Sequence, residues 1–149
     1  MDYEARRRLQ DSFIVDNQSV KNKDGGLQLS DETVPTFDNV VSGNKVEDNA
    51  VDCGMTIVSH VANHGTYDNT ISNNWSVGNG AAGIMLDTPV PGGIVSNNTV
   101  TNNYVEYNNL GGIGLHTHAP GSIVNGNTIE KLGCGQQGGS ASNESTSRY

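Results

Sequence analysis

The four histidines of this sequence lie in two short segments, with His60 and His64 in one and His116 and His118 in the other. An imidazole can transfer protons near neutral pH, and a neighbouring carboxylate can orient it and raise its pKa. When the chain is aligned on the repeat described below, one column contains Glu32, His60, Pro89 and His118, and another contains Ser30, Val58, Asp87 and His116. Asp87 is therefore expected beside His116. The sequence predicts a catalytic cluster made of His116, Asp87, His118, His60 and Glu32.

Metal binding is a weaker interpretation of the same residues. Two histidines separated by one residue share a face of a strand and could bind a transition metal. No cluster of Met or Cys accompanies His116 and His118, so no metal site is predicted there. Glu47, Asp48 and Asp52 could supply oxygen ligands to calcium. Eleven of the sixteen acidic residues precede residue 54, however, which favours a solvated acidic region, and we expect no cofactor unless calcium binds.

Aromatic side chains offer a second kind of candidate site. Trp75 and Tyr104 occupy the same position in successive repeats, and Tyr107 follows shortly after Tyr104. Stacked aromatic rings on an outer face can contact sugar rings, or they can simply pack on one another and shield a strand. Trp75, Tyr104 and Tyr107 are the predicted ligand-binding residues, with packing as the alternative.

An internal repeat positions these candidates. Residues 83–100 match residues 112–129 without a gap, with 10 of 18 positions identical. Related segments at 14–20, 40–46 and 65–71 extend the repeat toward the N-terminus, with small changes in its length. A nearly fixed period in this range indicates stacked supersecondary units that share one core. We expect five coils, in which the equivalent segments begin at positions 14, 40, 65, 94 and 123.

Within each repeat, apolar residues alternate with polar ones over short distances, which is typical of strands. The sequence predicts an all-β protein in which parallel strands stack into a β-helix. Two inward columns are expected, one with Val20, Val46, Ile71, Val100 and Ile129, and one with Leu29, Ile57, Leu86 and Leu115. Asparagine columns are expected at the bends, where their amides can bond from coil to coil. Their predicted members are Gln18, Asn44, Asn69, Asn98 and Asn127 in one column, and Asn22, Asp48, Asn73 and Asn102 in another, next to Asn49, Asn74 and Asn103.

The recurring pattern N-[TS]-[VI]-x-N-N, followed by G-[IM]-x-[LI], resembles the right-handed parallel β-helix proteins of the pectate-lyase-like superfamily over residues 13–132. The resemblance implies three parallel sheets per coil and favours an extracellular or cell-surface location. It implies no single activity, since lyases, hydrolases, epimerases and phage tailspikes share the pattern.

Three segments are expected along the chain. Residues 1–12 form an N-terminal cap with a short helix over residues 3–9, residues 13–132 form the β-helix, and residues 133–149 form a flexible tail. Self-association is expected at the C-terminal end of the solenoid, because an open end exposes apolar side chains and strand edges. Cys53 and Cys134 fall three coils apart, so no disulfide is expected between them.

Charge and hydropathy limit the partners. The net charge is −8 and the sequence pI is about 4.7, without a continuous basic stripe, so nucleic acid is not an expected partner. The basic run at residues 6–8 is not followed by the apolar segment of a signal peptide. The most apolar stretch, residues 81–86, is shorter than the ~20 residues that span a bilayer, so no membrane partner is expected.

Two functions remain open. The favoured one is a non-catalytic module that presents a rigid face to a carbohydrate or to a partner chain. The alternative is a polysaccharide lyase, epimerase or hydrolase that uses the His/Asp cluster. Every arginine lies outside the repeats, and the outward acids Asp87, Glu106 and Glu130 are not expected to be adjacent, which counts against the paired carboxylates of a hydrolase.

Overall fold

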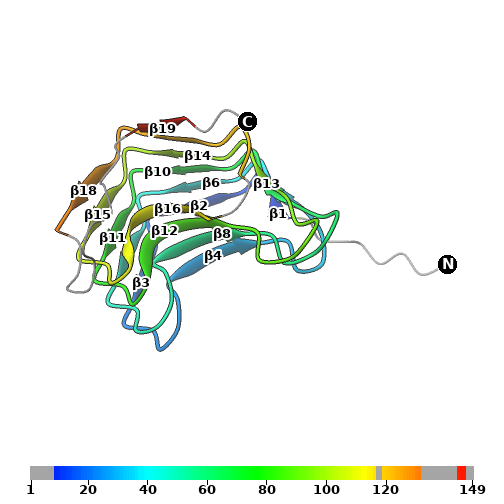
Figure 1. Ribbon diagram of the computed structural model, residues 1–149. Helices are drawn as coiled ribbons and strands as arrows, with labels where there is room; N and C mark the ends of the chain where they lie inside the picture. Colours follow the sequence, from blue (N-terminus) through cyan, green and yellow to red (C-terminus); the bar gives the residue numbers. More distant parts are fainter. Residues whose placement is uncertain (1–8, 117–118, 132–143, 147–149) are drawn as a thin grey trace.

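The computed structural model describes residues 9–116, 119–131 and 144–146, and these residues form a parallel β-solenoid of about four turns without a helix (Figure 1). The predicted all-β solenoid is confirmed. Strands of successive turns lie side by side in register, so each sheet runs along the length of the solenoid.

Four sheets surround the core, rather than the three that the family resemblance implies, and we name them A to D. Sheet A contains β1 (Leu9–Gln10), β5 (Thr36–Phe37), β9 (Thr66–Tyr67) and β13 (Val95–Ser96). Sheet B contains β2 (Phe13–Val15), β6 (Val40–Ser42), β10 (Thr70–Ser72), β14 (Thr99–Thr101), β17 (Ile123–Asn125) and β19 (Glu144–Thr146). Sheet C contains β3 (Gln18–Val20), β7 (Lys45–Glu47), β11 (Trp75–Val77), β15 (Tyr104–Glu106) and β18 (Thr128–Glu130). Sheet D contains β4 (Leu27–Ser30), β8 (Met55–Val58), β12 (Ala82–Asp87) and β16 (Gly111–His116).

The four complete turns are β1–β4, β5–β8, β9–β12 and β13–β16, and they are followed by β17 and β18. Their lengths are not uniform. Sheet B pairs Ile14 with Val41, Val41 with Ile71, Ile71 with Val100, and Val100 with Val124. The coil starts predicted at 14, 40, 65, 94 and 123 therefore do not match the residues that pair in sheet B. The predicted and observed spacings agree only between the third and fourth turns.

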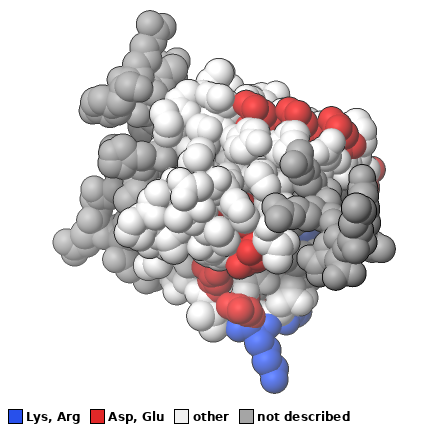
Figure 2. Space-filling view, turned by 90° about the vertical axis from the view of Figure 1, so that its right-hand side faces the viewer, with Lys and Arg blue, Asp and Glu red and all other residues white. Residues whose placement is uncertain are grey.

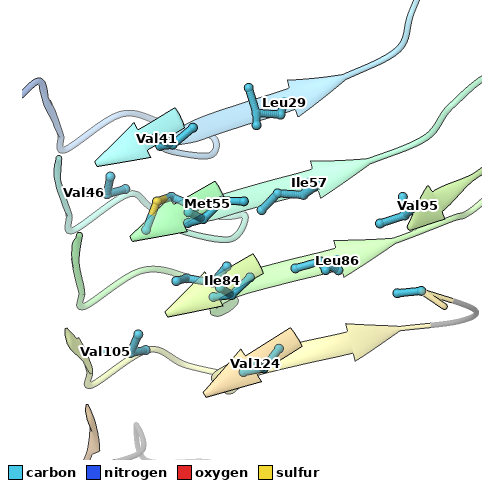
Figure 3. Close-up of a cluster of buried hydrophobic side chains, with 13 residues drawn as sticks. Leu29, Val41, Val46, Met55, Ile57, Ile84, Leu86, Val95, Val105 and Val124 are labelled. Atoms are coloured by element: carbon cyan, nitrogen blue, oxygen red, sulfur yellow. The ribbon is translucent and has the colours of Figure 1, made fainter. Parts of the chain in front are cut away.

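Small aliphatic side chains fill the interior of the solenoid, as Figure 3 shows. Leu29, Ile57 and Leu86 are at most 1% exposed, and sheet D pairs them in register with Leu115. This predicted inward column is confirmed. Where burial alternates along a strand, the neighbouring residues lie on the outer surface, where side chains can bind a partner. Sheet D departs from this alternation at Val58, which is buried beside Ile57.

The other predicted inward column is wrong, because it mixes two sheets. Val46 and Ile129 belong to sheet C, where they align with Ser76 and Val105, whereas Ile71 and Val100 belong to sheet B. Val20 does not face inward with them, since it pairs with Glu47. Asparagine recurs at every fifth position within a turn, at 39, 44 and 49 for example, so an alignment shifted by five positions still matches asparagine with asparagine.

Asparagine ladders run along three corners of the solenoid. In each ladder, the backbone N–H and the side-chain Nδ2 of one asparagine donate to Oδ1 of the asparagine in the next turn, at 2.8–3.3 Å. The ladders are Asn17–Asn44–Asn74–Asn103–Asn127, Asn22–Asn49–Asn79–Asn108 and Asn39–Asn69–Asn98. The predicted ladders exist, but their predicted membership is wrong in part, because of the same shift by five positions.

The residue before each ladder asparagine turns the chain. Asp48, Asn73 and Asn102, which were predicted to form a ladder, have φ of 51°, 55° and 55°. Asp and Asn adopt this left-handed conformation more readily than other non-glycine residues. These residues therefore make the corners, and the asparagines that follow them point inward and bond along the solenoid.

The two ends differ from the predictions where the structure describes them. Leu9 lies in β1 and pairs with Thr36 of β5, so the predicted helix does not include Leu9, and residues 1–8 lie outside the described part of the chain. In the tail, β19 pairs antiparallel with β17, and the flexibility predicted for the rest of residues 133–149 concerns residues outside the described part. Self-association at this end stays a prediction.

Cys53 is buried and forms no disulfide within the described residues, and burial raises the pKa of its thiol. Cys134 lies outside the described residues, so the predicted absence of a disulfide between the two cysteines is not tested.

Candidate functional site

The outer surface of sheet C carries the best-defined group of exposed side chains. Each strand of this sheet has three residues, and the middle one faces the core, as Val46, Ser76 and Val105 do at 1% exposure or less. The first and third residues therefore face outward. We call the following residues the aromatic–glutamate face: Lys45, Trp75, Tyr104, Glu47, Glu106 and Glu130.

Trp75 and Tyr104 are neighbours on β11 and β15, and their rings stack with centroids 4.0 Å apart and an interplanar angle of 17°. The predicted proximity of these two residues is confirmed. Trp75 is nevertheless 43% exposed. Stacking covers one face of each ring, and Lys45 is the neighbour of Trp75 in register on the other side, so the ring edges are the surface considered for a ligand. Thr128, which is the next residue in register after Tyr104, is small and leaves room beside the phenol ring.

Tyr107 lies outside this stack. It occupies the corner after β15 with φ of 54°, and its half-exposed ring contacts the ammonium of Lys131, which lies 5.2 Å from the ring centroid. A cation over an aromatic face is an attractive contact. Tyr107 can therefore contribute to the rim of the aromatic–glutamate face, but not to its ring stack.

A row of charged and polar contacts borders the rings. The hydroxyl of Tyr104 donates to Oε2 of Glu106 at 2.9 Å and lies 3.3 Å from Oε2 of Glu130. Lys131 pairs with Glu106 at 3.3 Å, and Lys45 pairs with Glu47 at 2.9 Å. The expectation that Glu106 and Glu130 are not adjacent is wrong, because β15 and β18 pair them directly. A final turn shorter than the repeat in the sequence alignment brings them together.

We expect the hydroxyl of Tyr104 to titrate near pH 12. Its hydrogen bond to Glu106, together with burial and the charges of Glu106 and Glu130, raises its pKa to about 12 from 10.0. Above pH 10 the unfolded chain loses this proton while the folded protein keeps it, so the stabilisation is complete below pH 10 and is lost as the pH rises through about 12. Ultraviolet titration of phenolate should show this late transition, and Tyr104→Phe should remove it. Identical curves for both proteins would contradict the assignment.

A second group of polar residues lies where sheet D leads into sheet A. Asp31 is fully buried, and its carboxylate accepts hydrogen bonds from Ser59 Oγ at 2.6 Å and from the backbone N–H of His60 at 2.6 Å. Ser59 Oγ in turn accepts from the backbone N–H of Ile94 at 2.9 Å. These contacts join three successive turns. Because Ser59 is also fully buried, its hydroxyl is a structural group rather than an accessible nucleophile.

The predicted catalytic residues meet only in part around this group. Nδ1 of His60 lies 2.5 Å from Oε1 of Glu32, so this predicted pair does come together on adjacent turns. The register of β12 and β16 pairs Asp87 with His116, as predicted. The side chain of His116, and the whole of His118, lie outside what the structure describes. Val58, in the same column as Asp87, is 2% exposed, so this column is not uniformly solvent-facing.

Asp31 and Ser59 were not predicted from the sequence to be hydrogen-bond partners. Asp31 is one of the eleven acidic residues that precede residue 54, and an acidic residue in an acidic region is expected in solvent. The signal in the sequence for the burial of Asp31 was its position directly after a strand whose leucines face the core. The hydrogen-bond partners of its carboxylate come from the next turn, at Ser59 and His60, which lie 28 and 29 residues further along the chain.

The acidic residues considered for calcium do not converge. Glu47 pairs with Lys45, Asp48 turns a corner, and Asp52 accepts the backbone N–H of Cys53 while it lines a cavity of about 210 Å³ together with Asp24. In the described part of the chain, no three His, Cys, Asp or Glu side chains form a group able to hold a metal ion. Figure 2 shows acidic side chains in a row along the upper edge of one face of the molecule, with basic ones near its lower end.

The architecture places this chain in the class of parallel β-solenoid proteins. Comparison with known proteins adds no narrower assignment, because no family model, no curated protein and no solved structure matches the chain. The pectate-lyase-like resemblance therefore stays an expectation. Within the described residues, no helix has the length and apolar character needed to cross a membrane.

Proposed function

We propose that this protein is a non-catalytic module that binds a carbohydrate on the aromatic–glutamate face of sheet C. The observation that carries the proposal is the exposed Trp75–Tyr104 stack beside hydrogen-bonding carboxylates. Aromatic rings combine a large apolar surface with few rotatable bonds, and carboxylates accept hydrogen bonds from hydroxyl groups. A sugar presents both C–H and O–H groups, so this combination suits it.

Rigidity of the scaffold supports the same proposal. The middle residues of β7, β11 and β15 are buried, and two asparagine ladders flank these strands at both ends. Trp75 and Tyr104 are therefore held by backbone that is paired on both sides. Binding on such a face costs little ordering of the protein, which favours affinity.

Trp75→Ala is expected to weaken carbohydrate binding at least about tenfold, which corresponds to about 1.4 kcal/mol. A glycan array would identify the bound oligosaccharide, and calorimetry would measure its affinity for each variant. Phe37→Ala is the matched control, because Phe37 and Tyr67 form another stacked pair, 5.1 Å apart, on strands of sheet A. Equal loss in both variants, or no loss in Trp75→Ala, would contradict the proposed site.

A second candidate function is a polysaccharide lyase, epimerase or hydrolase that uses the predicted His/Asp cluster. It is supported by the contact between Glu32 and His60 and by the register of Asp87 with His116. The two functions differ in product formation. Release of reducing ends or unsaturated sugars, abolished by His116→Ala, would favour the enzyme, whereas binding without product favours the module.

A further inference from the structure

We infer that the carbohydrate bound on the aromatic–glutamate face is a neutral polysaccharide, without carboxylate groups. This inference rests on the proposed function and adds the class of the ligand. It excludes polyuronates, the polysaccharides that carry a carboxylate on each sugar, as ligands of this face. The register of sheet C brings together charged residues, such as Glu106 and Glu130, that the repeat alignment of the sequence places apart.

Carboxylates outnumber ammonium groups on this face. Glu47, Glu106 and Glu130 follow one another in the third position of the strands, with Val77 between the first two. The ammonium group of Lys45 on the face is engaged by Glu47 at 2.9 Å, and that of Lys131, in the corner after β18, is engaged by Glu106 at 3.3 Å. Neither lysine is therefore a free partner for an anionic sugar.

The corners that flank sheet C do not reverse this balance. Asp16 and Asp48 are acidic corner residues, and Lys21 is the additional basic one. With the face itself, the count is five acidic against three basic residues, a local charge of −2 within a chain of net charge −8. A polyuronate would therefore approach a surface of net negative charge, and this repulsion weakens binding most at low ionic strength.

The hydroxyl groups of a neutral sugar can donate hydrogen bonds to the carboxylate oxygens of this face. Among the described residues, Glu130 has the Tyr104 hydroxyl at 3.3 Å as its hydrogen-bond partner, so its carboxylate has room to accept further hydrogen bonds. The Glu106 carboxylate is held by Tyr104 and Lys131, which fixes its orientation for a ligand. The face thus offers fixed acceptors beside apolar ring edges, which is the complement of an uncharged sugar chain.

The test compares hexasaccharides of different charge by calorimetry, at low and at physiological ionic strength. The probes are the neutral hexamers of cellulose, xylan and mannan, the anionic hexagalacturonate, and the cationic hexamer of chitosan. We expect at least one neutral hexamer to bind with little salt dependence, and hexagalacturonate to bind at least about tenfold more weakly. The double variant Glu106→Gln/Glu130→Gln should narrow that difference by about tenfold.

A matched charge control separates local from overall repulsion. Asp11→Asn/Asp38→Asn removes the same two charges from exposed corner residues between sheets A and B, where Asn tolerates the φ of 50° and 55°. This variant should leave the difference in affinity between the neutral hexamers and hexagalacturonate unchanged. Circular dichroism and thermal melting would show that both double variants fold, and Glu47→Gln provides a further single substitution on the same face.

The outcomes distinguish this inference from the proposed function. If hexagalacturonate binds at least as tightly as every neutral hexamer, and Trp75→Ala abolishes that binding, the site is confirmed and the neutral class is wrong. Binding of the chitosan hexamer alone, lost at physiological ionic strength, would also overturn the neutral class. If none of the five hexamers binds, or if binding is insensitive to Trp75→Ala, the proposed function itself fails.

Discussion

Asn74→Ala is expected to lower the free energy of unfolding by about 3 kcal/mol or more. The Asn74 side chain is 2% exposed and makes four ladder hydrogen bonds at 2.9 Å. Its Oδ1 accepts from the backbone N–H and Nδ2 of Asn44, and its Nδ2 donates to Val41 O and Asn103 Oδ1. Alanine leaves these groups buried with fewer partners, and each loss of that kind costs about 1–3 kcal/mol.

Urea unfolding followed by far-ultraviolet circular dichroism would measure this effect. Asn109→Ala is the control, because Asn109 is exposed. Its backbone N–H, which alanine keeps, donates to Asn79 O at 3.0 Å. It should change stability by no more than about 0.5 kcal/mol. A similar small change for Asn74→Ala would mean that the ladders contribute little to stability.

Gly83→Ala is the second large effect that we expect, with a loss of about 3 kcal/mol. Gly83 belongs to a column with Gly26, Gly54 and Gly112, each located just before the inward strand residues of sheet D. A Cβ at position 83 would overlap Cγ1 of Val105 and lie 2.8 Å from Asn108 Nδ2 and 2.9 Å from Gly112 O. The obstacle is space, since this glycine does not have positive φ.

Because one of these contacts is backbone, the neighbouring turn must shift to accept the methyl group. Gly25→Ala is the matched control in the same sheet corner, since its nearest contacts would lie at 3.4 Å, an ordinary packing distance. Thermal or urea unfolding of both variants would test the difference. Equal stability of the two variants would show that the turns can separate at low cost.

How far the site could be predicted differs from residue to residue. The pairing of Trp75 with Tyr104 and of Asp87 with His116 followed from the repeat period, which the third and fourth turns keep. The pairing of Glu106 with Glu130 did not, because the last turn is shorter than that period in sheets B and C. The contacts of the buried Asp31 carboxylate come from Ser59 and His60 of the next turn, so they have no local signature in the sequence.

By itself, the sequence determined that this protein is an all-β parallel solenoid with asparagine ladders. Alternating apolar residues, a long period and turn-forming residues at fixed intervals agree on that architecture, because a repeated short-strand unit can bury its apolar side chains only by stacking. Only the tertiary structure decided the register. Asparagine recurs at every fifth position, so several alignments satisfy the sequence equally, and the choice among them depends on how complete turns pack, at Gly83 and Val105 for example. That choice brings Glu106 and Glu130 together on the surface.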